Sequence, residues 1–66
     1  MNITVNGKPS KIEPETSIVI LLNQYNIKSP MTIVEINETV VPKEQWMTHT
    51  LEDGDNVEII QLMGGG

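Results

Sequence analysis

The sequence predicts an α+β domain in which one helix packs against a curved, mixed β-sheet. Two observations carry this prediction: several short segments alternate apolar and polar residues, and one segment repeats apolar residues at helical spacing. A single short helix cannot bury a core alone, so a sheet has to cover its apolar stripe. We expect one domain over residues 1–66, because a chain of 66 residues is too short for two separate cores.

The first elements should form a tight β-hairpin. Ile3 and Val5 alternate with polar residues, which is typical of a half-buried strand. Asn6-Gly7 follows, and this dipeptide favours a two-residue turn because both residues tolerate a positive φ. A second strand over residues 8–12 should return antiparallel, and the proline near its start marks it as an edge strand.

The one clear helical pattern follows a proline-containing turn. Thr16 or Ser17 can cap this helix through the side-chain hydroxyl, and the helix should end near Asn26. Val19 and Ile20 lie off the apolar stripe, so we expect them to be exposed. The stripe itself repeats at i, i+3, i+4 and i+7 and comprises Ile18, Leu21, Leu22 and Tyr25.

The remaining elements complete the sheet. We expect strands over residues 31–37, 39–41 and 56–63, one helical turn over 43–46, and an isolated core residue at Leu51. Side chains alternate between the two faces of a strand, so every second residue should face the helix. The buried face should therefore collect Ile3, Val5, Ile12, Val34, Ile36, Val57 and Ile59.

The composition argues against several classes of function. The formal net charge of −5 repels phosphate backbones, so nucleic acid is not an expected partner. The chain has no cysteine, and its single histidine, His49, cannot form a zinc site alone; we expect no bound metal and a surface position for His49. The longest apolar run, residues 18–22, is too short to cross a membrane, and the N-terminus lacks a signal-peptide pattern. We therefore expect a cytoplasmic protein with no membrane partner.

The chain ends in three consecutive glycines, Gly64, Gly65 and Gly66, directly after the last predicted strand. Glycine has no side chain, so such a tail can thread a narrow channel and present a free carboxylate. We expect this tail to be flexible. The tail alone leaves two alternatives open, a frayed terminus without a role and an expression scar.

An apolar surface beside the tail is the candidate docking site. Ile60 and Leu62 should point away from the helix-facing side of the last strand, and Met63 follows them at the base of the tail. Together with Ile33 they could form an exposed patch, which often marks a protein-binding site. The alternative is that loops or a crossing strand cover these residues.

Two sequence blocks precede the glycine tail. Residues 36–46 read INETVVPKEQW, and residues 51–59 read LEDGDNVEI. The first block is similar to the I-N-x-x-x-V-P-[RK]-x-x-W segment of the ThiS family of sulfur carriers, and the second to its L-x-x-G-D-x-[VI]-x-[IL] segment. The resemblance covers the whole chain, although Gly64 stands where that family varies. It implies a ubiquitin-like β-grasp fold, in which a curved mixed sheet packs on one main helix.

The resemblance also implies that the chain is acted upon by enzymes and is not itself a catalyst. A ThiF-like enzyme that binds ATP and Mg²⁺ would adenylate the carboxylate of Gly66. Sulfur from a cysteine desulfurase or a rhodanese-type donor would then give a thiocarboxylate, which a ThiG-like thiazole synthase would use for thiamin thiazole synthesis. The chain would bind no cofactor. The residues expected to contact these partners are Gly64, Gly65, Met63, Leu62 and Ile60.

Three other functions stay open at this point. The small subunit of molybdopterin synthase uses the same kind of tail, although that family usually runs longer. A ubiquitin-like modifier would be joined through its tail to lysines on target proteins. A β-grasp interaction module would carry an inert tail.

Overall fold

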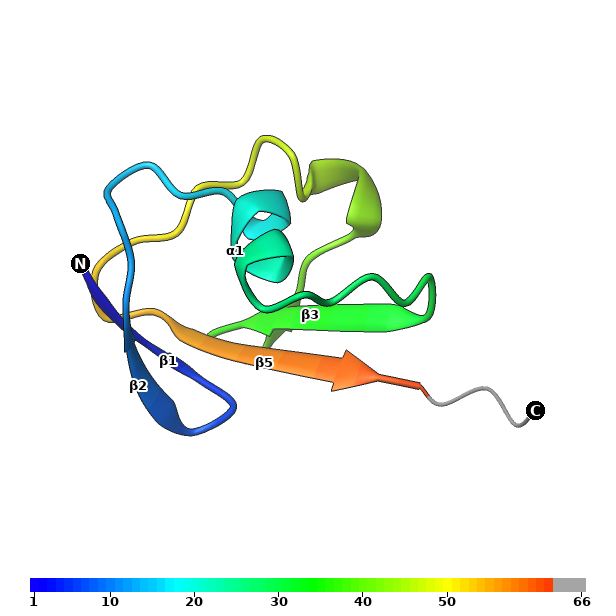
Figure 1. The fold of residues 1–66 in the computed structure, drawn as a ribbon, viewed down its shortest axis with the longest axis horizontal. Helices are drawn as coiled ribbons and strands as arrows, with labels where there is room; N and C mark the ends of the chain where they lie inside the picture. Colours follow the sequence, from blue (N-terminus) through cyan, green and yellow to red (C-terminus); the bar gives the residue numbers. More distant parts are fainter. Residues whose placement is uncertain (63–66) are drawn as a thin grey trace.

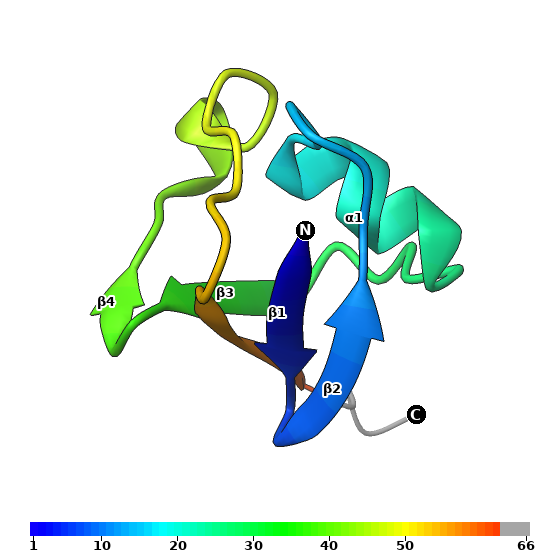
Figure 2. The same cartoon turned by 90° about the vertical axis from the view of Figure 1, so that its left-hand side faces the viewer.

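The computed structural model describes residues 1–62 and contains one five-stranded sheet with a helix on one face (Figure 1). The strand order is β2-β1-β5-β3-β4. Figure 2 shows the helix α1 and the short 3₁₀ helix η1 on the same side of the sheet. In chain order the elements are β1 (Asn2–Val5), β2 (Lys8–Lys11), α1 (Ile18–Gln24), β3 (Thr32–Ile36), β4 (Thr39–Val40), η1 (Lys43–Gln45) and β5 (Asn56–Gln61).

The sheet is mixed, as the sequence predicted. β1 pairs antiparallel with β2 but parallel with β5, and β5 pairs antiparallel with β3. A parallel pair needs a long crossover connection, and here the chain from α1 through β4 and η1 supplies it. The first and last strands of the sequence therefore lie side by side near the middle of the sheet.

The helix begins at the predicted cap but is shorter than its apolar pattern suggested. The hydroxyl oxygen of Ser17 accepts a hydrogen bond from the amide of Ile20 at 3.2 Å, which satisfies one of the free N–H groups of the first turn. The helix ends at Gln24, and Asn26 adopts a positive φ of 57°. Tyr25 is consequently not part of the buried stripe: its side chain is 42% exposed, and its hydroxyl donates to Ser10 Oγ at 3.0 Å.

The core lies between the helix and the inner face of the sheet, and it contains every inner-face residue that alternation predicted. Ile20 is exposed as expected, whereas Val19 packs against the core and contradicts the prediction that it is exposed. Trp46 is buried, and its indole N–H donates to the carbonyl oxygen of Val41 at 2.9 Å. The buried apolar residues are Ile3, Val5, Ile12, Ile18, Leu21, Leu22, Val34, Ile36, Val41, Trp46, Leu51, Val57 and Ile59.

Two hairpin turns use residues with positive φ. Asn6 and Gly7 have φ values of 50° and 82°, which confirms the predicted turn between β1 and β2. Asn37 and Glu38 have φ values of 51° and 69° and turn β3 into β4. Over residues 1–62, no helix is long and apolar enough to cross a membrane.

Candidate functional site

Strand β5 leads from the core toward the C-terminus and is the element that positions the candidate site. It lies between β1 and β3 in the sheet. In Figure 1 it runs past the tip of the β1–β2 hairpin and ends on the side of the molecule opposite the N-terminus. The sheet therefore fixes the direction in which the chain leaves Gln61.

The start of β5 is held by a network of polar side chains around Asn37. The backbone amide of Asn37 donates to the carbonyl oxygen of Asn56 at 2.8 Å, and Asn37 Oδ1 accepts from the amide of Asn56 at 2.9 Å. Asn37 Nδ2 donates to Asp55 Oδ1 at 3.0 Å, while Asp55 Oδ2 accepts from the amide of Glu52 at 2.8 Å. Asp55 is buried, so these bonds satisfy a carboxylate that has lost most of its contact with water.

The second half of β5 is held on the β1 side by Asn6. Its Oδ1 accepts from the amide of Ile59 at 2.7 Å, and its Nδ2 donates to the carbonyl oxygen of Ile59 at 3.2 Å. The side-chain amide thus makes the two bonds that a neighbouring peptide group would make. Sequence reasoning missed this contact because the two residues are 53 positions apart and Asn6 already had an explanation as a turn residue.

The outer face of β5 and β3 carries an apolar patch, defined here as Met31, Ile33, Ile60 and Leu62. Ile33 and Ile60 are directly opposite each other in the antiparallel pair. The amide of Leu62 donates to the carbonyl oxygen of Met31 at 2.9 Å, which places these two residues side by side as well.

The residues of this patch are accessible from solvent. Ile60 is 40% exposed, Leu62 46% and Met31 49%, and Ile33 is partly buried. Within residues 1–62, no loop or strand covers them, so the covered alternative is wrong for this part of the chain. Met31 was not among the predicted site residues, although its place next to Leu62 follows from the register of the two strands.

The predicted site residues beyond Leu62 are Met63, Gly64, Gly65 and Gly66, and they lie outside the described residues. The interpretation of Gly66 as the reacting carboxylate, and of the other three as partner contacts, stays a prediction. Ile60 and Leu62 are exposed as expected, and their role in partner binding is likewise a prediction.

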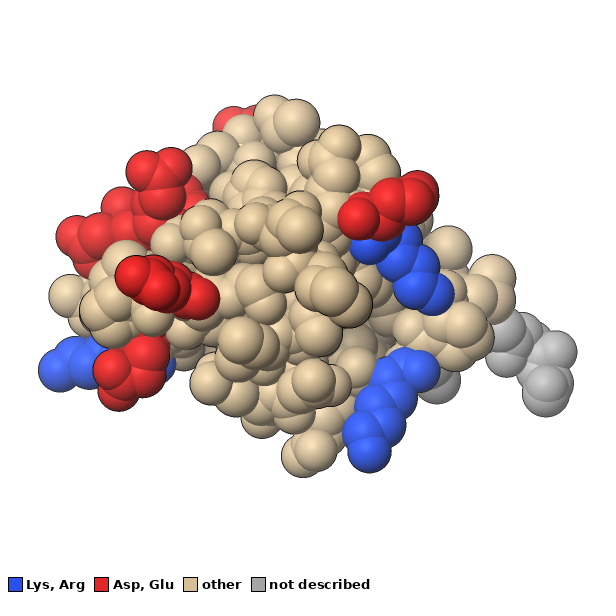
Figure 3. All heavy atoms as spheres, turned by 90° about the horizontal axis from the view of Figure 1, so that it is seen from above, with Lys and Arg blue, Asp and Glu red and all other residues tan. Residues whose placement is uncertain are grey.

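Charge is distributed unevenly over the surface. In the view of Figure 3, acidic side chains gather at the end of the molecule that is remote from the end of β5. The turns over residues 13–16 and 52–55 lie at that end in Figure 1, and Glu13, Glu15, Glu52 and Asp53 are exposed there. The apolar patch has carboxylates of its own beside it, because Glu35 and Glu58 lie opposite each other on the same outer face, next to Ile33 and Ile60. A partner that covers the patch would therefore meet negative charge at one margin.

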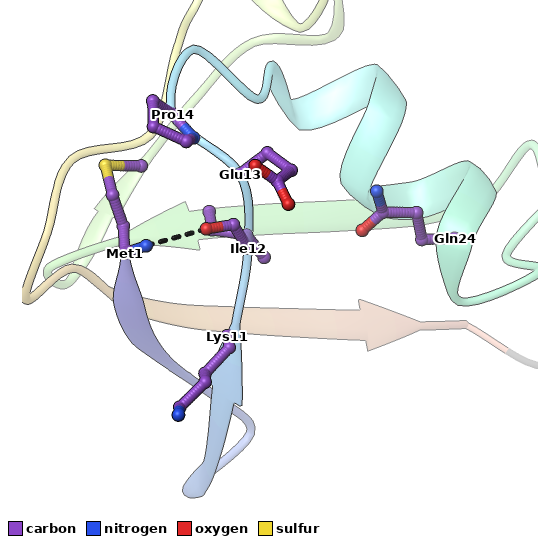
Figure 4. A pocket seen from close by; sticks show the side chains of 6 residues that line it. All are labelled: Met1, Lys11, Ile12, Glu13, Pro14 and Gln24. Atoms are coloured by element: carbon purple, nitrogen blue, oxygen red, sulfur yellow. Dashed lines mark hydrogen bonds between the residues drawn. The ribbon is translucent and has the colours of Figure 1, made fainter.

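A cleft at the N-terminal side of the sheet is a second candidate location, and it does not have the composition of an active site. Figure 4 shows Lys11, Glu13 and Gln24 around it, and the amino group of Met1 donating to the carbonyl oxygen of Ile12 at 2.7 Å. Among the residues that line this cleft there is one carboxylate and no serine, cysteine or histidine, so it has no nucleophile–base pair.

His49 is partly exposed, in accord with a surface position. The backbone of His49 helps to hold the start of the helix, because its carbonyl oxygen accepts a hydrogen bond from the amide of Ile18 at 3.1 Å. In the described part of the chain, His, Asp and Glu side chains form no group of three that could hold a metal ion.

Comparison with known proteins assigns the fold to a family. The model of the ThiS family matches residues 3–66, which is almost the whole chain. The chain belongs to the ThiS family. The sulfur carrier protein ThiS of Escherichia coli (strain K12) is 30% identical over 66 residues, and the match covers 100% of both chains.

A solved ThiS structure has the same architecture. The crystal structure of the thiamine biosynthesis protein ThiS from Geobacter metallireducens is 38% identical to this chain, covers 100% of both chains, and superimposes with a TM-score of 0.85. The predicted β-grasp fold is thereby confirmed.

This chain is also similar to part of larger proteins. A protein named thiazole synthase from Paramagnetospirillum magneticum is 30% identical over 66 residues, and the match covers 100% of this chain but 20% of that protein. A ThiS-like segment is thus part of the same polypeptide as a thiazole synthase in that organism.

Proposed function

We propose that this protein is a sulfur carrier of thiamin thiazole synthesis, whose C-terminal carboxylate is converted to a thiocarboxylate by partner enzymes. The observation that carries the proposal is the family match over residues 3–66, which includes the final glycine. Full-length similarity to proteins named sulfur carrier protein ThiS supports it. The chemistry of the terminus makes the proposal concrete.

A carboxylate is a poor acyl donor, because its negative charge repels nucleophiles and an oxide ion is a poor leaving group. In the proposed first step, a carboxylate oxygen of Gly66 attacks the α-phosphorus of ATP, forming an acyl-adenylate and releasing pyrophosphate. A sulfur nucleophile from a donor enzyme then attacks the acyl carbon and AMP leaves. Where that nucleophile is the outer sulfur of a cysteine persulfide, the product is an acyl disulfide. A second thiol then attacks the donor's sulfur, forms a disulfide with it, and leaves a thiocarboxylate at Gly66. ATP and Mg²⁺ bind to a ThiF-like adenylating enzyme in this scheme.

The chain itself contributes positioning rather than catalysis. It has no cysteine, so the sulfur has to come from another molecule, such as a cysteine desulfurase or a rhodanese-type donor. Strand β5 is fixed in the sheet and directs the chain outward, while the apolar patch beside its end offers a surface for docking. A docked domain would hold the terminus at high effective concentration in the partner's active site.

A ThiG-like thiazole synthase is the proposed acceptor of the sulfur. The similarity to proteins named thiazole synthase supports this choice, because segments that act together are often found in one polypeptide. The similarity to proteins named thiazole synthase also favours thiazole synthesis, over molybdopterin synthesis and protein modification, as the process that uses the tail.

Intact-mass measurement tests the proposal. The chain is produced together with a ThiF-like enzyme and a cysteine desulfurase. It is then purified, and its intact mass is measured by mass spectrometry. We expect a mass increase equal to the replacement of one oxygen atom by sulfur, confined to a C-terminal peptide. Larger covalent adducts on lysines of other proteins would indicate a modifier instead, and an unchanged mass in the presence of an enzyme that adenylates a known ThiS would contradict the proposal.

A further inference from the structure

The turn between β1 and β2 combines a reactive dipeptide with a structural contact. Asn6 is the only asparagine in the sequence that is followed by glycine; each of the others precedes a larger residue. An asparagine side chain loses its amide most readily in this setting, because glycine has no side chain to shield its backbone nitrogen and leaves the backbone free to bend. The sequence therefore places its most reactive side-chain amide in this hairpin turn.

The reaction needs only water. The backbone nitrogen of Gly7 attacks Cγ of Asn6 and gives up its proton, and a bond forms between this nitrogen and Cγ. The bond from Cγ to Nδ2 breaks, and Nδ2 leaves with that proton as ammonia. Water then opens the resulting succinimide ring at either of its two carbonyl carbons, so that the products are aspartate and isoaspartate.

The turn is open to the solvent that this reaction requires. Asn6 and Gly7 are both exposed. Gly7 has a φ of 82°, and among the described residues no atom outside its chain neighbours lies within 4 Å of the place where a Cβ would stand. Packing around the turn therefore does not keep water away from the backbone nitrogen of Gly7.

The side-chain amide of Asn6 is nevertheless held away from the reaction by β5. Its Oδ1 accepts from the amide of Ile59 at 2.7 Å, and its Nδ2 donates to the carbonyl oxygen of Ile59 at 3.2 Å. Ring closure has to turn Cγ from β5 toward the nitrogen of Gly7, and both hydrogen bonds break when it does. The folded domain should therefore react only through a local opening of this contact.

The products cannot rebuild the contact. A carboxylate accepts hydrogen bonds but donates none, so the carbonyl oxygen of Ile59 loses its donor. Isoaspartate also adds one carbon atom to the main chain, which changes the length of a two-residue turn. β1 pairs with β5 at Thr4 and Val5 alone, so the Asn6 side chain is the tie between the two strands beyond Val57.

We propose that Asn6 is a site of spontaneous deamidation, which its bonds to Ile59 protect in the folded domain. Conversion to isoaspartate releases the second half of β5 from β1 and leaves its pairing with β3 in place. The strand that carries Ile60 and Leu62 would thereby lose its support on one side. This inference goes beyond the proposed function and does not depend on it, because it uses only the turn and the strand contacts.

Peptide mapping by mass spectrometry tests the site and its protection. The chain is incubated in mildly alkaline buffer, once folded and once in urea. We expect conversion at Asn6 in urea, and conversion at least about tenfold slower in the folded chain, because two hydrogen bonds have to break first. Asn37 is the internal control: its side chain also bonds to β5, but Glu38 follows it, so it should stay intact while Asn6 is converted.

A variant separates the chemistry of the dipeptide from the fold. Gly7→Ala adds a side chain next to the attacking nitrogen, and in urea its effect does not depend on whether the variant folds. We expect conversion of Asn6 in urea to be slower in Gly7→Ala than in the wild type. Equal rates would overturn the assigned reaction, and an intact Asn6 after prolonged incubation of the wild type in urea would overturn the site.

Amide hydrogen exchange tests the structural consequence. The isoaspartyl form, which carries one more negative charge, is separated by ion exchange and compared with the unmodified chain by NMR. We expect the amide of Ile59 to exchange at least about tenfold faster in the isoaspartyl form. The amide of Leu62, which bonds to Met31 on the β3 side, should keep its protection.

The remaining outcomes decide between local release and its alternatives. Equal rates of conversion in the folded and the urea-treated chain would overturn the protection by Ile59. Unchanged exchange at Ile59 in the isoaspartyl form would overturn the release of β5. Loss of protection at Leu62 as well would show general unfolding and would likewise overturn a local release. No partner enzyme takes part in these measurements, so their failure leaves the proposed function standing.

Discussion

The two ends of β5 are built in different ways. At its start, Val57 is paired on both sides, by β1 and by β3, Asn56 pairs with β1 and bonds to Asn37, and the buried carboxylate of Asp55 ties the preceding turn to Asn37. At its end, Ile60 is paired with Ile33 of β3, the amide of Leu62 bonds to the carbonyl oxygen of Met31, and both Ile60 and Leu62 carry exposed apolar side chains. The first end therefore supplies stability, whereas the second supplies a surface. Under the proposed function the domain needs both, because a tail can be delivered accurately only from a rigid base.

Substitutions in the glycine tail should have the largest effect. They should lower the rate of adenylation without changing the stability of the fold. Gly65→Ala and Gly66→Ala each add a Cβ where we expect the partner's channel to be narrow. We expect ATP–pyrophosphate exchange to fall about 100-fold or more, because a misplaced reacting group costs that much. The melting temperature should not change. Exchange at the wild-type rate with both variants would show that the channel tolerates a side chain.

Removing the carboxylate at the base of β5 should produce the opposite result. Asp55→Ala leaves Asn37 Nδ2 and the amide of Glu52 without their acceptor. We expect the free energy of unfolding in urea to fall by about 2–4 kcal/mol, since each of the two lost hydrogen bonds to a charged group contributes about 1.5–3 kcal/mol. Glu52→Ala is the control: its side chain is exposed, so its effect should stay within about 0.5 kcal/mol. A similar loss of unfolding free energy in Asp55→Ala and Glu52→Ala would mean that the Asp55 carboxylate has no special part in stabilising the start of β5.

Ile59 and Ile60 are adjacent on β5, and substituting each in turn compares the stabilising role of the core with the docking role of the apolar patch. Ile59→Asp puts a charge into the core and should unfold the domain, because Ile59 is 7% exposed. Ile60→Asp puts the same charge on the apolar patch. We expect it to change the free energy of unfolding by less than about 1 kcal/mol and to raise the KM for the carrier about tenfold. A melted Ile60→Asp protein would mean that this residue belongs to the core.

The smallest effect is expected at the margin of the patch. Met31→Ala removes an exposed side chain from the β3 side, next to Leu62. Most interface residues contribute less than about 1 kcal/mol, so the KM should rise less than about fivefold. Exposed Met47 is the control, because it follows Trp46, whose carbonyl oxygen bonds to the helix amide of Val19; its replacement by alanine should leave the KM unchanged. A larger effect at Met47 than at Met31 would place the docking surface elsewhere.

Residue periodicity was sufficient to predict the α+β class and the buried strand residues, because each of these residues obeys a local rule, whereas the β-grasp fold was implied by the family resemblance. The inner-face residues of β1, β3 and β5 alternate regularly, and all of them are buried. The helix was predicted too long because its pattern continues to Tyr25, where the chain in fact leaves the helix for a turn at Asn26. Periodicity reports which residues are apolar and cannot tell a buried ring from one that lies half in solvent.

The part of the site that could not be predicted depends on long-range polar contacts. Asn6 and Asn37 each looked like a turn residue, and both are; the structure adds that their side chains reach β5, 53 and 19 positions away for Ile59 and Asn56. An asparagine amide can replace a peptide group anywhere along a strand, so composition gives no indication of which strand it meets. Met31 was missed for a related reason, since its place beside Leu62 depends on strand register.

The bond between the amino group of Met1 and the carbonyl oxygen of Ile12 has a practical consequence. Together with the bond from the amide of Ile12 to the carbonyl oxygen of Met1, it has the form of one more rung of the β1–β2 ladder. A peptide nitrogen at this position can donate in the same way as the amine, so an affinity handle joined ahead of Met1 should preserve the rung. Because Met1 lies across the molecule from the end of β5, a chain immobilised through such a handle would keep its glycine terminus free for soluble enzymes.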